Sequence, residues 1–204
     1  TKEEQLNLLI IKLHIHKLSK SYQEYYSFIK NEFSKLDTIL GSDMIYQSIK
    51  CGEIEVLYPD NNDAIKYLES YISLLKEQNM LKSKLGLGAL YELAELYTKN
   101  KEYLKAISIN EQSLFLIQEL YGEQSISYID ELDVLSTRYL TIGNYKTYVD
   151  YQNQMFELIK KYYGKNSHLY IQKKANPFNT YFTSKESLNE LLSILNNNDY
   201  KNLP

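Results

Sequence analysis

Three histidines and one cysteine are the side chains of this 204-residue chain best suited to hold a metal or act as nucleophiles. His14 and His16 are two positions apart, so on the helix predicted here they point about 200° apart. A metal pair on a helix needs a spacing of four. His168 is distant in sequence, and Cys51 has no histidine nearby, which favours a small buried cysteine. The sequence therefore predicts no metal centre, no cofactor and no catalytic residues.

Phosphate recognition is not predicted either. The segment 84–88, KLGLG, lacks the glycine spacing and the preceding strand of a phosphate loop. The 21 tyrosines offer faces on which bases could stack, but several fall at repeated positions that packing explains. The formal net charge of −3 opposes contact with phosphates, so nucleic acid is not an expected partner.

The apolar stretches and the cysteine count indicate the cellular compartment. No apolar stretch approaches the roughly 20 residues needed to span a bilayer, and no signal-peptide cleavage pattern is present. A single cysteine excludes an internal disulfide and suits a reducing compartment. We expect an intracellular protein, cytoplasmic or nuclear, without a membrane partner. The oligomeric state is not indicated.

A repeat of 42 residues is the strongest pattern in the chain. Gly122 and Gly164 lie in the same phrase, YGEQS at 121–125 and YGKNS at 163–167. At that offset the segments 87–129 and 129–171 align leucine with leucine and tyrosine with tyrosine at many positions. A fixed period of this length indicates stacked supersecondary units, each of which contacts only its neighbours.

Apolar residues recur at helical spacing almost throughout, with turns at Gly, Pro and Asn. Gly122 and Gly164 are predicted to end helices in the left-handed conformation. The predicted helices span about 4–18, 20–39, 43–57, 63–79, 82–99, 102–121, 125–141, 145–163 and 184–195. They form four hairpins, at about 1–42, 43–81, 82–123 and 124–171, within a repeat domain of 1–175.

The segment 176–204 is predicted to be a linker and a C-terminal capping helix. Asn176-Pro177 interrupts the preceding helix, and Thr183 with Glu186 has the spacing of a capping box. Leucines at 188, 191, 192 and 195 then form a narrow apolar stripe. Solenoids need such a helix to cover their last apolar face.

The third hairpin resembles a tetratricopeptide repeat. Leu93, Ala94, Tyr97, Tyr103 and Ala106 match, in order, the family's leucine, small residue, two aromatics and alanine. The usual period is 34, and the longer period here looks like that of the kinesin-light-chain type. The resemblance implies an all-α fold, a right-handed solenoid of antiparallel helix hairpins whose first helices line a concave groove.

Projecting that groove onto this chain predicts a peptide-binding surface. It would consist of Glu53, Tyr91, Glu95, Asp130, Asp133 and Thr137. Carboxylates in series favour a protein or peptide carrying Lys or Arg, although a merely solvated acidic face is the alternative. The Lys/Asn/Arg clamp of chaperone-tail-binding relatives is absent, because those positions hold Tyr91, Glu95, Asp133 and Thr137.

The sequence therefore predicts a non-catalytic scaffold that binds a peptide or a partner helix in a concave, acidic groove. The alternative is a helical accessory or sensor domain of a larger protein. That protein would be a SET-MYND-type methyltransferase or a peptide-sensing transcriptional regulator. The first residue is Thr1 rather than Met, so we expect that the chain can be part of something longer.

Overall fold

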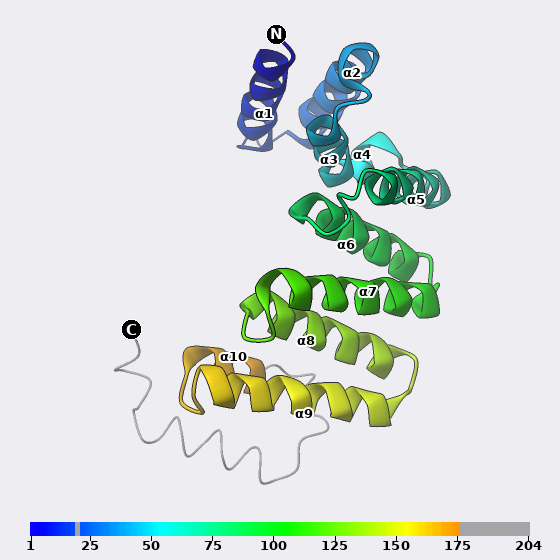
Figure 1. Cartoon of the computed structure of the whole chain (residues 1–204). Coiled ribbons are helices and arrows are strands. Elements are labelled where there is room, and N and C mark those ends of the chain that lie inside the picture. Colours follow the sequence, from blue (N-terminus) through cyan, green and yellow to red (C-terminus); the bar gives the residue numbers. More distant parts are fainter. Residues whose placement is uncertain (19–20, 176–204) are drawn as a thin grey trace. The chain divides into compact units, whose positions relative to one another are not determined.

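The computed structural model describes residues 1–18 and 21–175 (Figure 1). Every regular element in these residues is a helix, which confirms the predicted all-α repeat fold. The chain divides into two compact units, Thr1–Ser113 and Leu114–Pro204. The boundary lies inside α7 (Tyr103–Tyr121). The capping helix predicted at 184–195 lies outside the described residues, and the handedness of the solenoid stays a prediction.

The first unit is built from paired helices. Its elements before α7 are α1 (Lys2–Leu18), α2 (Tyr22–Leu40), α3 (Met44–Gly52), α4 (Ile54–Leu57), α5 (Asn61–Glu77) and α6 (Lys84–Lys99). In the first pair, α1 packs against α2 through Leu6, Leu9 and Leu13, which are buried with Ile29 and Phe33 of α2. Helix α5 packs on α6, so the second predicted hairpin meets the third there, and α3 also packs on α6.

The predicted helix 43–57 is wrong in one respect, because it breaks after Gly52. Glu53 has non-helical dihedral angles, with φ −115° and ψ 20°, and its carbonyl accepts from the amides of Val56 and Leu57 that begin α4. Glycine has a weak preference for the helical state, about 1 kcal/mol below that of alanine. Interrupting the helix at this position therefore costs little free energy. The interruption places Glu53 between two helices rather than on one.

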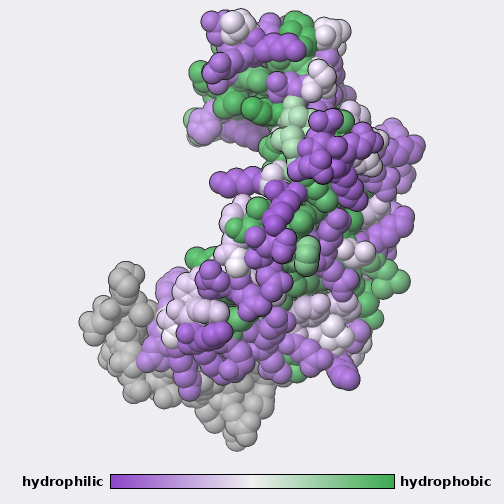
Figure 2. Space-filling model, in the orientation of Figure 1, coloured by the Kyte–Doolittle hydropathy of each residue, from purple (hydrophilic) through white to green (hydrophobic). Residues whose placement is uncertain are grey.

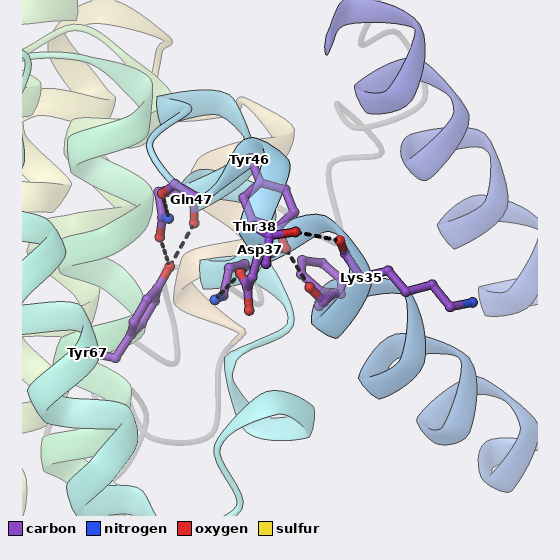
Figure 3. Close-up of polar contacts among 9 residues, drawn as sticks. Lys35, Asp37, Thr38, Tyr46, Gln47 and Tyr67 are labelled. Carbon is purple, nitrogen blue, oxygen red and sulfur yellow. Dashed lines mark hydrogen bonds and ion pairs between the residues drawn. The ribbon is translucent and has the colours of Figure 1, made fainter. Parts of the chain in front are cut away.

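A partly buried polar cluster connects α2, α3 and α5 (Figure 3). The Tyr46 hydroxyl donates to Asp37 Oδ1 at 3.0 Å, and Lys50 Nζ lies 2.8 Å from the same oxygen. Tyr67 points at Gln47 and donates to its side-chain and backbone oxygens. Burial raises the pKa values of Tyr46 and Tyr67, so both hydroxyls keep their protons and act as donors.

The second unit contains the end of α7 followed by α8 (Ile126–Thr141), α9 (Tyr145–Tyr162) and α10 (His168–Lys174). The α8–α9 hairpin has the most extensive packing between two helices of this unit. Its buried core includes Leu132 and Leu135 from α8 with Met155 and Ile159 from α9. The helix predicted at 145–163 is α9, and it packs on α8, the helix predicted at 125–141.

The repeated phrase forms a helix stop followed by a helix start. Gly122 and Gly164 have φ values of +79° and +89°, which confirms the predicted left-handed ends. Ser125 and Ser167, three residues later, cap α8 and α10 by accepting from the amides of Tyr128 and Tyr170. The short helix α10 was not predicted from the sequence, although the phrase before it is the one that precedes α8.

Alanine at Gly164 is expected to destabilise the protein by about 1–2 kcal/mol, because a Cβ disfavours the left-handed conformation. An added Cβ would meet no described atom within 4 Å, so the loss reports backbone strain alone. The matched control is Gly88→Ala, inside α6 and equally uncrowded. It should stabilise by about 0.5–1 kcal/mol. Urea denaturation of both variants measures the two effects, and equal signs would contradict the assignment.

Candidate functional site

The six predicted groove residues fall into two places that we describe separately. Tyr91 and Glu95 lie on α6, and Asp130, Asp133 and Thr137 lie on α8, as helix residues. Glu53 is the exception, because it occupies the break between α3 and α4. The first place belongs to the first unit and the second to the second unit. That all six share one groove stays a prediction.

Glu53 is held inside the first unit instead of being presented to solvent. Its residue is only 6% exposed. Lys17 Nζ, from the end of α1, lies 2.6 Å from Glu53 Oε1, and the Tyr25 hydroxyl of α2 donates to Oε2. Burial, and then this hydrogen bond, raise the pKa of Tyr25, so the donor keeps its proton. Glu53 therefore ties α1 and α2 to the α3–α4 break.

A cavity of about 250 Å³ adjoins Glu53 and is lined by residues 52–56 together with Glu92 of α6. Three of its lining residues are the glutamates Glu53, Glu55 and Glu92. Glu53 and Glu55 are ion-paired, the first with Lys17 and the second with Lys99. The cavity is therefore acidic, and the described residues compensate only part of its charge.

Glu92 is the carboxylate of this cavity that has no hydrogen bond or ion pair with a described residue. Burial is the main cause that raises its pKa, and the neighbouring Glu55 raises it further. The sequence analysis did not select Glu92. It lies three residues before Glu95, so the two share one side of a helix, and that spacing is the signal that could have found it.

The remaining predicted residues of the first unit do not line the cavity. Tyr91 is about half exposed on α6 and presents an aromatic face to solvent. Glu95 is partly buried, engages in contacts of its own, and raises the pKa of Glu92. The structure thus brings Glu53 together with Glu92, and not with Tyr91 or Glu95, in the cavity.

In the second unit, the structure brings Asp130 and Asp133 together around a lysine of α10. Lys173 Nζ lies 2.8 Å from Asp130 Oδ1 and 2.8 Å from Asp133 Oδ2. Burial opposes the ammonium form, but the two hydrogen bonds prevail and raise the pKa of Lys173. The single ammonium of Lys173 therefore offsets part of the charge of these two carboxylates. Thr137 is exposed, and its hydroxyl donates to the Asp133 carbonyl at 3.0 Å.

Gln152 of α9 completes this network below the surface. Its Nε2 donates to Asp133 Oδ1 at 3.1 Å and to Ser136 Oγ at 2.6 Å. The residue is 7% exposed, and its Oε1 has no hydrogen-bond partner among the described residues. Asp133 therefore links α8 to both α9 and α10. The sequence pattern, which only places Asp133 on one face of a helix, does not indicate this role.

His16 packs against an aromatic ring, and Cys51 lies in the core. The His16 ring stacks on Phe28 with centroids 4.0 Å apart. Cys51 is buried, and burial raises the pKa of its thiol to about 12, so it is not a thiolate at neutral pH. Within residues 1–18 and 21–175, no group of three or more His, Cys, Asp or Glu side chains is arranged to hold a metal. No helix of that part is long and apolar enough to cross a bilayer.

Comparison with known proteins gives structural relatives only. No protein-family model matches the chain, and no curated protein sequence matches it either. The chain is similar to the crystal structure of TPR-like repeats of a kinesin light chain from Podosopora anserina. The TM-score is 0.73 at 15% identity, over 97% of this chain and 96% of that chain. A variant of the same protein gives 0.73 at 14% identity, over 98% and 95%.

A second protein has a similar structure, BtubC (BKLC) from P. vanneervenii. Its TM-score is 0.61 at 16% identity, over 88% of this chain and 75% of that chain. Identities this low show the fold alone. They confirm that the chain has a tetratricopeptide-like helical-repeat fold similar to the repeats of a kinesin light chain, as residues 82–171 indicated.

Proposed function

We propose that the chain is a protein-interaction scaffold that binds a polypeptide carrying Lys or Arg. The fold supports the general part, because helical repeats present extended surfaces to other chains. The acidic cavity of the first unit supports the basic partner and carries the proposal. Glu92 lines that cavity without an ion pair to any described residue.

The dimensions of the cavity favour a single side chain as the occupant. Sites for drug-sized ligands usually measure about 300–1,000 Å³, and this cavity holds about 250 Å³. A lysine or arginine side chain is long enough to enter while its backbone stays outside. The ammonium or guanidinium group would then pair with Glu92, whose ionised form is disfavoured by burial and by its acidic neighbours.

One ion pair does not hold a polypeptide. Exposed pairs contribute only about 0–1 kcal/mol each, so several contacts must act together with apolar ones. Tyr91 on the same helix offers an exposed ring for a cation–π contact, worth about 0.5–1 kcal/mol. Binding should therefore weaken as salt rises, because the Debye length falls from about 10 Å at 0.1 M to about 3 Å at 1 M.

The variant Glu92→Gln is expected to affect binding and stability in opposite directions. It removes the charge that a cation would meet, so affinity for a basic partner should fall. The free energy of unfolding at pH 7 should rise, because a raised pKa means that the folded state disfavours the carboxylate. That gain should vanish as the pH is lowered until Glu92 is protonated in the parent. Titration calorimetry and urea denaturation at several pH values measure the two effects.

The partner itself is to be identified by affinity capture and mass spectrometry, and the bound segment then synthesised as a peptide. Glu77→Gln is the matched control, since Glu77 is an exposed glutamate at the end of α5, away from the cavity. It should leave affinity unchanged. If the peptide binds the parent and Glu92→Gln equally, at both low and high salt, the cavity is not the binding site and the proposal is wrong.

A further inference from the structure

The three carboxylates of the acidic cavity are compensated to different degrees. Glu53 has a side chain that is only 7% exposed, and it is ion-paired with Lys17 from inside the unit. Glu55 is ion-paired with Lys99, and these two side chains are 64% and 46% exposed. Glu92 has no ion pair with a described residue. The cavity therefore has one buried ion pair, one exposed ion pair and one uncompensated carboxylate.

Lys99 acts on Glu92 as well as on Glu55. It follows Glu92 by seven residues on α6, which is about two turns, so the two residues lie on one side of the helix. A long side chain on a helix points toward the N-terminus of the helix, which here is the direction of Glu92. The ammonium of Lys99 lowers the pKa of Glu92 and so opposes the effect of burial. Its positive charge is therefore felt by both carboxylates, although it pairs with only one.

The backbone at this cavity also favours a positive charge. Helix α3 ends at Gly52, which lines the cavity together with Glu53. The C-terminal end of a helix carries a partial negative charge on its last carbonyl groups. A Cβ added to Gly52 would meet no described atom within 4 Å, so the space beside this helix end is open. The preference for a cation thus depends on a helix end as well as on side chains.

The charges around the cavity are not a requirement of the repeat. Figure 2 shows largely hydrophilic surface over α5 and α6, the helices next to the cavity in sequence. The positions 42 residues before and after Glu92 and Lys99 do not repeat this pair of charges. They hold Lys50 and Val134 in the first case, and Leu57 and Thr141 in the second. The arrangement is therefore particular to α6, and packing between repeats does not explain it.

We propose, resting on the function proposed for the cavity, that Glu55 and Glu92 together receive the partner's cationic side chain. Until the partner displaces it, Lys99 is the counter-ion of Glu55. An exposed ion pair such as Lys99–Glu55 contributes little stability, so its exchange for another cation costs little. The Lys17–Glu53 pair is different, because breaking it would leave a buried carboxylate uncompensated. Glu53 therefore keeps its own lysine and does not receive the partner.

NMR titration of the full chain tests the role of Lys99 without any partner. Lys99→Gln removes the ammonium that favours ionised Glu92, so the pKa of Glu92 should rise further. Lys66→Gln is the matched control, because Lys66 forms an exposed ion pair with Asp63 on α5 and does not line the cavity. It should leave the pKa of Glu92 unchanged. Equal pKa values in the parent and in Lys99→Gln would overturn the proposal, whatever the cavity binds.

Binding is measured with a blocked pentapeptide, acetyl-Ala-Ala-Lys-Ala-Ala-amide, while the side-chain carboxyl signals of Glu55 and Glu92 are followed by NMR. Lys99→Gln should bind this peptide about twofold to fivefold more tightly than the parent, because no internal cation has to be displaced. Glu55→Gln should bind it more weakly, because one of the two receiving carboxylates is lost. Lys66→Gln should bind it as the parent does. Circular dichroism checks that each variant is folded.

The outcomes distinguish the role of Lys99 and Glu55 from the function proposed for the cavity. If Glu92→Gln weakens binding but Lys99→Gln binds no more tightly than the parent, the cavity receives the cation and the role of Lys99 is wrong. If Glu55→Gln binds as tightly as the parent, Glu55 is not a receiving carboxylate and the proposal is overturned. If Glu92→Gln binds as the parent does, or the peptide binds neither the parent nor Lys99→Gln, the function proposed for the cavity is overturned as well.

Discussion

Replacing Leu132 with alanine is expected to lower the free energy of unfolding by about 2–5 kcal/mol, the usual cost of a large-to-small change in a packed core. Leu132 is fully buried on α8, where the α8–α9 hairpin is closed by Met155 and Ile159. Urea denaturation measures the loss. Leu104→Ala is the control, because Leu104 is largely exposed and its truncation should cost no more than about 0.5 kcal/mol.

The same variant reports how far cooperativity extends along the repeats. In a repeat array each unit contacts only its neighbours, so destabilisation is expected to stay local. Amide hydrogen exchange of Leu132→Ala should accelerate most in α8 and α9 and least in α1 and α2. Equal acceleration in all four helices would instead mean that the chain unfolds as a single cooperative body.

The fold was predictable because its signals are local and repeated. Helical spacing and the phrase around Gly122 and Gly164 depend on residues within a few positions of each other, and the structure confirms both left-handed glycines. The break after Gly52 was missed, because a glycine inside a helical pattern is also tolerated. The start of α10 was missed even though Ser167 caps it as Ser125 caps α8.

The acidic side chains were predictable as types, but their partners were not. A helix pattern places Asp133 on a face, yet the lysine that meets it lies 40 residues later on α10. Glu53 is likewise paired with Lys17, from a helix two elements earlier. Such contacts depend on tertiary packing, which the sequence spacing of a single helix does not encode. Glu92 is the exception, because its spacing of three from Glu95 already places the two carboxylates on one side of a helix.

Because of these pairings, a charge reversal on α8 is expected to affect stability as well as binding. Asp133→Lys is expected to lower the free energy of unfolding by about 3 kcal/mol, because it breaks a mostly buried ion pair and leaves Lys173 facing a like charge. The side chains of Asp133 and Lys173 are only 16% and 15% exposed. The Gln152 amide would also lose an acceptor. Thermal and urea denaturation measure the loss.

Asp130→Lys is the matched comparison on the same helix and against the same lysine. The Asp130 side chain is 54% exposed, so its pair with Lys173 should be worth only about 0–1 kcal/mol. Adding Lys173→Asp to Asp133→Lys should recover part of the lost stability, and only part, since Asp130 would then face an added carboxylate. If Asp133→Lys and Asp130→Lys cost the same, the α8–α10 network does not stabilise the fold. In that case Asp133→Lys could serve as a test of partner binding in the second unit, because it would not destabilise the fold. Glu92→Gln is expected to serve that purpose in the first unit.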